Sequence, residues 1–174
     1  MYPAGRRIAR GLPCGLARSR TSAVACCVLD GLFVTPAVTA ITEALVATKA
    51  DGRLAVVGNA KLATALGVSR DVIPVALSAR AAKKLPQTIA AVTALEPASL
   101  AAVVGVDLAT DDNWEATLRD WSRVVRDGGT IIIVDRGHPH EASRRALCGG
   151  LTEIEQRHAG RAVITSGLVS HLGG

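Results

Sequence analysis

Residues 121–135, with the sequence WSRVVRDGGTIIIVD, constrain the fold of this chain more than any other stretch. Before and within them an apolar side chain recurs every three or four positions, which predicts a helix with one buried stripe. The members of this stripe are Trp114, Leu118, Trp121 and Val125. Gly128 and Gly129 are typical of a left-handed helix end. Residues 130–134 then form a β-branched run without polar alternation, as in a parallel strand buried on both faces. A helix followed at once by such a strand predicts an α/β fold.

The rest of the chain continues this alternation of helices and strands. Asp112, with Glu115 three residues later, predicts a capping box at the start of the striped helix. Apolar periods and turn residues predict further strands at 53–57, 72–77, 88–92, 100–108 and 161–165, and helices at 36–50, 60–66, 79–85 and 141–158. Because crossovers between parallel strands are right-handed, this order predicts a doubly wound, Rossmann-like, mostly parallel sheet.

Ligands of doubly wound sheets bind at the carboxyl ends of the strands. The segments expected at that edge are 58–60, 76–78, 93–94, 107–112 and 135–138. This edge is therefore the predicted functional site.

Charge divides the chain near residue 30. Residues 1–29 hold five arginines and no acidic residue, so removing them from the 20 Lys and Arg leaves 15, equal to the 15 Asp and Glu. We therefore expect a basic N-terminal extension over 1–29 and one domain over 30–174. A neutral domain argues against a nucleic-acid partner, which requires a basic face.

The basic extension has the composition of an organelle transit peptide. A disordered bacterial N-terminus and a start codon placed too early are the alternatives, so the compartment is either the mitochondrial matrix or the bacterial cytoplasm. Asp30 interrupts the apolar run over 23–38, which leaves no stretch long enough for a membrane helix. The four cysteines lack CxxC spacing and are expected to be reduced thiols, and the sequence predicts no metal site.

Residues 99–135 also resemble a known family. Residues 103–108 (VVGVDL) and 113–135 (NWEATLRDWSRVVRDGGTIIIVD) are similar to strand four, the following helix and strand five of class I S-adenosylmethionine-dependent methyltransferases, most closely the small-molecule, type 11-like enzymes. The resemblance implies a sheet that finishes with an antiparallel strand pair. With only one strand predicted after residue 135, we expect that pair to be abbreviated.

The resemblance also implies a site for S-adenosylmethionine. The residues that it places around the cofactor are Gly58, Asn59, Ala60, Ala76, Ser78, Glu96 and Asp107. The family's glycine-rich loop is reduced to Gly58, and the acid that holds the ribose hydroxyls at the end of strand two is replaced by Ala76. We therefore expect cofactor binding to be weakened or lost.

Acids and histidines also follow the last two central strands. They are Asp107, Asp111, Asp112, Asp135, His138 and His140. A histidine there could serve as a general base, although solvated loop histidines and a helix-capping aspartate explain the same residues, and no catalytic residue is assigned. Trp114 and Trp121 are expected in the core, and Arg144 and Arg145 on a solvated helix face.

Two functions follow from these observations. The first is a methyltransferase that acts on a small-molecule acceptor. The second is a methyltransferase-like domain that has lost catalysis and serves as a structural or assembly subunit, with protein partners in a larger, for example mitochondrial, complex. The lost acid and glycines favour the second function. A dinucleotide-dependent dehydrogenase fits less well, because no GxGxxG follows any predicted strand.

Overall fold

The computed structural model describes residues 31–85 and 87–171. The predicted extension over 1–29 lies outside the described residues. The helices are α1 (Gly31–Ala47), α2 (Ala60–Leu66), α3 (Ala79–Ala82), α4 (Trp114–Val124) and α5 (Pro139–Cys148), with 3-10 turns η1 (Val92–Ala94) and η2 (Leu108–Thr110). The strands are β1 (Leu54–Val57), β2 (Val72–Val75), β3 (Leu100–Val106), β4 (Val125–Arg136), β5 (Thr152–Ala159) and β6 (Ala162–Leu168). None of the described helices is both long enough and apolar enough to span a membrane.

These strands form one sheet in the order β2-β1-β3-β4-β6-β5. The four strands from β2 to β4 are parallel, whereas β6 runs antiparallel to both β4 and β5. The α/β class and the mostly parallel sheet are thus confirmed.

The C-terminal strand pair is not abbreviated. β5 covers eight residues and β6 seven, and they pair along most of their length. The prediction of a helix over 141–158 with a break at Gly149 and Gly150 was therefore wrong in its second half, because α5 ends at Cys148 and the chain continues past the two glycines as β5.

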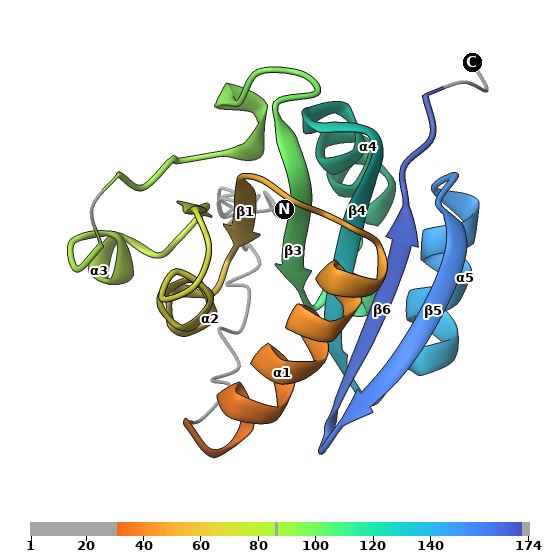
Figure 1. The fold of residues 1–174 in the computed structure, drawn as a ribbon, viewed down its shortest axis with the longest axis horizontal. Coiled ribbons are helices and arrows are strands. Elements are labelled where there is room, and N and C mark those ends of the chain that lie inside the picture. Colours follow the sequence, from red (N-terminus) through yellow and green to blue (C-terminus); the bar gives the residue numbers. More distant parts are fainter. Residues whose placement is uncertain (1–30, 86, 172–174) are drawn as a thin grey trace, which may run out of the picture.

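Helices cover both faces of the sheet (Figure 1). On one face, α1 and α2 bury Ile41, Leu45 and Leu62 against β1, β3 and β4. On the other, α4 and α5 bury Leu118, Trp121, Ala146 and their neighbours against the opposite sides of the same strands. Since both faces of the central strands are covered, their sequences are continuous apolar runs.

Strand three of the expected fold is reduced to a single bridge. Ile89 pairs with Val75 outside any named strand of the described chain. Its amide donates to the Pro74 carbonyl, and its carbonyl accepts from the Ala76 amide. The strand predicted over 88–92 was wrong, because Ala90 and Ala91 are exposed and the chain turns into η1. β2 therefore forms one edge of the sheet, which suits the proline at position 74.

The striped helix begins and ends differently from the prediction. Its N-terminus is braced by Asp111, which accepts from the Asn113 amide and the Thr117 hydroxyl, so the capping box at Asp112 was wrong. α4 ends at Val124, and Gly128 and Gly129 lie inside β4. There they form an irregular stretch of the β3–β4 pairing and exchange hydrogen bonds with Val169.

Candidate functional site

The carboxyl ends of the parallel strands form the edge at which the sequence places the site, and the arrowheads of β1 and β3 point to it in Figure 1. Gly58 follows β1, Ala76 follows β2, and Asp107 follows β3. Backbone hydrogen bonds join the neighbouring strands up to this edge: the Gly58 amide donates to the Val75 carbonyl, and the Asp107 amide donates to the Val134 carbonyl. The topology thus brings these three predicted residues to one edge.

Two polar residues of this edge already have local partners. The Asn59 side chain accepts from the Leu62 amide at 2.9 Å and caps α2, beside Ala60 at its first position. The Ser78 hydroxyl accepts from the Ala81 amide at 3.4 Å and caps α3. Both side chains therefore satisfy helix N-termini, which is what such residues commonly do after a strand.

The ribose-acid position contains no polar side chain. Ala76 is exposed and has a φ of 52°, in the left-handed region that disfavours alanine. The position can hold asparagine or aspartate more easily than alanine, since both tolerate this conformation. An apolar residue thus occupies a backbone position suited to an acid.

Glu96 lies away from the other predicted residues. It precedes the amino end of β3, where its carbonyl accepts from the Ser99 hydroxyl and the nearby Ala98 amide donates to Arg123 at the end of α4. Because β3 runs parallel to β1, the chain returns to the amino edge of the sheet before Leu100, and Glu96 lies on this return. The structure therefore separates Glu96 from Gly58, Ala76 and Asp107.

Two carboxyl groups meet where β3 and β4 end. Val106 pairs with Val134, so Asp107 and Asp135 are the next residues on neighbouring strands. Asp135 is 1% exposed; its Oδ1 accepts from the Ala109 amide at 3.0 Å, and its Oδ2 has no hydrogen-bond partner in the described chain. Burial, together with the smaller effect of the nearby Asp107 charge, raises the pKa of Asp135 to about 6. The hydrogen bond from the Ala109 amide lowers this pKa, but by less than burial raises it. Burial also raises the pKa of Asp107, which Arg136 opposes. Asp135 is therefore an acid that can exchange a proton near neutral pH.

The two candidate histidines are exposed, and of the two only His138 acts on the charge of Asp135. His138 precedes α5, and its charge lowers the pKa of Asp135 to a small extent, while His140 lies in the first turn of α5. Among the described residues no group of three or more His, Cys, Asp or Glu side chains is placed to hold a metal ion.

No protein-family model matches this sequence, and neither does any curated protein sequence. Solved structures do match. The T. thermophilus 16S rRNA N2 G1207 methyltransferase, in complex with AdoMet and guanosine, is 16% identical with a TM-score of 0.54 over 69% of this chain, which spans 36% of that protein. The N-methyltransferase NodS from Bradyrhizobium japonicum is 12% identical with a TM-score of 0.59, covering 83% of this chain and 100% of that one.

A third match comes from the complex between the Haloferax volcanii Trm112 methyltransferase activator and a methyltransferase. It is 11% identical with a TM-score of 0.60, covering 75% of this chain and 89% of that one. The chain has the fold of the class I S-adenosylmethionine-dependent methyltransferases. The narrower resemblance to type 11 enzymes stays a prediction.

Beyond the edge, the methyltransferase-like domain has an unpredicted arginine clamp. The Arg145 side chain is 13% exposed and donates to Glu141 on its own helix and to the carbonyls of Leu108 and Asp111, in and just after η2. With Arg144, it holds the pKa of Glu141 down at about 2, the Arg144 hydrogen bonds having the larger effect. The solvated face predicted for Arg145 was wrong; Arg144 is exposed.

This clamp gives a testable difference between two adjacent arginines. Arg145→Lys should lower the free energy of unfolding by about 2 kcal/mol, because one ammonium cannot replace a guanidinium that serves three acceptors. Urea denaturation measures the change. Arg144→Lys is the matched control: the Arg144 side chain is 55% exposed and donates to Glu141 but to neither carbonyl that Arg145 reaches, so a much smaller loss is expected. Equal losses in the two variants would show that the η2 contacts contribute little.

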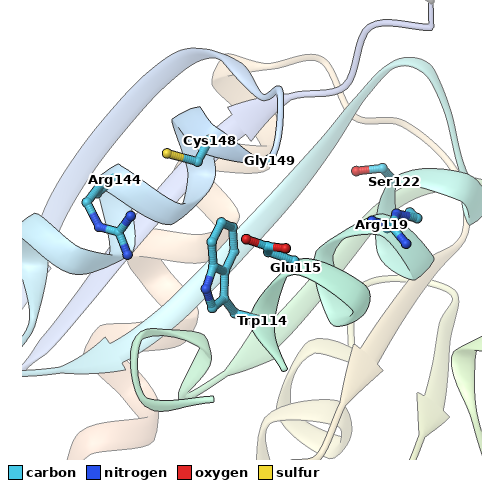
Figure 2. A pocket seen from close by; sticks show the side chains of 7 residues that line it. All are labelled: Trp114, Glu115, Arg119, Ser122, Arg144, Cys148 and Gly149. Atoms are coloured by element: carbon cyan, nitrogen blue, oxygen red, sulfur yellow. The ribbon is translucent and has the colours of Figure 1, made fainter. Parts of the chain in front are cut away.

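A groove of about 490 Å³ lies between α4 and α5. Figure 2 shows its lining: Trp114, Glu115, Arg119, Ser122, Arg144, Cys148 and Gly149. The guanidinium groups of Arg144 and Arg145 lie 5.8 and 5.5 Å from the centre of the Trp114 ring. The apolar stripe correctly predicted that Trp114 packs toward the core, where it is partly buried. The groove itself depends on how α4 and α5 meet, which no local pattern encodes.

Proposed function

We propose that this chain is a methyltransferase-like domain that has lost S-adenosylmethionine-dependent catalysis and acts as a non-catalytic subunit of a protein assembly. The observation that carries the proposal is Ala76, an exposed alanine at the position where the resemblance implies the ribose-binding acid. Each charge-assisted hydrogen bond to such an acid contributes about 1.5–3 kcal/mol. Losing two of them would weaken binding by about 10²- to 10⁴-fold.

The rest of the edge supports the same conclusion. Asn59 and Ser78 are engaged as helix caps, and Glu96 lies at the opposite edge. Of the seven residues implied by the resemblance, Asp107 is the remaining one with a polar side chain that faces this edge without a capping role. The basic, acid-free extension favours an organelle complex as the setting, with the bacterial cytoplasm as the alternative.

An active methyltransferase is the second candidate. The fold and the Asp107–Asp135 pair at the carboxyl edge favour it, because Asp135 could accept a proton from a small-molecule acceptor near neutral pH. Methyl transfer depends mainly on alignment of the acceptor with the sulfonium, so a weak cofactor site could still support it. The neighbour solved with its activator shows that at least one protein of this fold works in a complex.

Calorimetric titration of S-adenosylmethionine and S-adenosylhomocysteine into the full chain separates the two candidates. We expect no heat and no thermal shift at millimolar ligand. Ala76→Asp should restore measurable binding, because aspartate tolerates the left-handed backbone and supplies the missing acceptor. Ala76→Asn is the matched control, with the same shape and no charge. Micromolar binding by the unaltered chain that Gly58→Arg abolishes would instead favour the enzyme over the non-catalytic subunit.

A further inference from the structure

The α4–α5 groove has the features of a protein-binding surface. Its floor contains the Trp114 indole, and its sides present Arg119 and Arg144 (Figure 2). Tryptophan and arginine are the residues most enriched at the energetic centres of protein interfaces. On α5, Leu147 precedes the lining residue Cys148 and is 61% exposed, one of few large apolar side chains of the described chain so open to solvent.

Two charges on α4 have no partner. Glu115 and Arg119 are four residues apart on one exposed helix face, and glutamate preceding arginine at this spacing is the favourable order for an ion pair. Nevertheless, neither makes an ion pair or side-chain hydrogen bond with any described residue. By contrast, Glu141 is fully engaged by Arg144 and Arg145. Figure 2 shows the Glu115 carboxylate turned toward Trp114 and Arg119 further along the helix.

The two charges of α4 can pair with the same two charges on a second copy of the chain. If two copies of α4 cross antiparallel about a two-fold axis between positions 115 and 119, Glu115 of each copy faces Arg119 of the other. Such two-fold contacts are the commonest in homo-oligomers, and they require a surface that complements itself in this way. Leu147 adds an exposed apolar side chain at the same end of α5 as the lining residues Cys148 and Gly149.

We propose that the α4–α5 groove is a self-association surface that receives a second copy of this chain. The proposal goes beyond the proposed function and does not depend on it, because no residue that lines the groove is among those that the resemblance places around S-adenosylmethionine. A contact rimmed by exposed ion pairs is sensitive to salt, so the dimer should dissociate as ionic strength rises.

Sedimentation of the full chain over a range of concentrations tests the proposal. The unaltered chain should be in monomer–dimer equilibrium. Glu115→Arg and Arg119→Glu should each raise the dissociation constant about tenfold or more, since each replaces two reciprocal ion pairs with like charges. The decisive sample mixes the two variants in equal amounts: they should form a heterodimer that neither forms alone, because their charges are then complementary.

Controls make each outcome interpretable. Lys61→Glu reverses an exposed charge on α2, far from the groove in sequence, and should leave the dissociation constant unchanged. Far-UV circular dichroism verifies that the variants fold, which is expected because positions 115 and 119 are exposed. A chain that is monomeric at every concentration overturns the proposal. So does a dimer that neither variant weakens, or one that the mixture of variants does not restore.

Discussion

Replacing Trp121 with alanine is expected to lower the free energy of unfolding by about 3–5 kcal/mol, which is typical of truncating a buried aromatic side chain. Trp121 is 3% exposed and packs from α4 onto the sheet in the second core cluster. Its ring lies directly over Gly105 of β3: a Cβ added at Gly105 would stand 1.9 Å from the Trp121 ring. The Trp121 ring therefore occupies the space that a side chain at position 105 would need, so the two residues pack as a unit.

A double-mutant cycle tests that unit. Gly105→Ala should destabilise the unaltered chain by about 1–3 kcal/mol, because the added methyl group overlaps the ring. In a Trp121→Leu background the same substitution should cost much less, which gives a coupling free energy of at least about 1 kcal/mol. Urea denaturation followed by far-UV circular dichroism is the suitable measurement, since Trp121 is one of only two tryptophans and fluorescence would change with it. Equal costs in the two backgrounds would show that the ring moves aside freely.

The sequence predicted the centre of the sheet well because that region is buried on both sides. The sequences of β1, β3 and the second half of β4 are almost continuously apolar. In a chain of this length, few structures other than a buried strand can accommodate such short runs. β5 was missed for the opposite reason. It is an edge strand whose residues are mostly exposed, and charged side chains interrupt any alternation, so Thr152–Ala159 could equally continue a helix.

The end of α4 illustrates how tertiary contacts override a local signal. Two consecutive glycines predicted a helix stop, but the helix already ends at Val124, where Val125 pairs with Leu100. Gly129 is needed in β4 because a Cβ there would stand 2.8 Å from the Ala101 carbonyl oxygen. The glycines thus allow a close approach between two strands, a requirement that only the folded sheet reveals.

For the candidate site, the order of the elements was enough to predict which loops share an edge. Gly58, Ala76 and Asp107 meet there because parallel strands end together. Hydrogen-bond partners could not be predicted: Asp111 rather than Asp112 braces α4, and Asn59 and Ser78 cap helices. Glu96 was misplaced because it lies just before β3, where the chain has already returned to the amino edge to begin a parallel strand.

The ionisation of Asp135 is expected to make this protein less stable as pH rises toward neutrality. Its pKa is raised from 3.8 to about 6 in the folded chain. Between these values the folded state holds a proton that the unfolded chain has released, so the free energy of unfolding falls as pH rises through this window. At 1.36 kcal/mol per pKa unit, the full effect is about 3 kcal/mol, complete above about pH 7.

Asp135→Asn isolates this contribution. The amide oxygen can keep the hydrogen bond from the Ala109 amide, and the group no longer ionises. The difference in unfolding free energy between the unaltered chain and the variant should therefore change by about 2–3 kcal/mol from pH 4 to pH 7.5, in the direction that favours the variant at high pH. Asp112→Asn is the matched control, because Asp112 is exposed and should leave the profile unchanged. Parallel profiles for Asp135→Asn and the unaltered chain would mean that the pKa of Asp135 is the same in the folded and unfolded chain, as when water hydrates the Oδ2 atom. The buried carboxyl would then be an ordinary structural acid, and the main support for proton transfer at this edge would be gone.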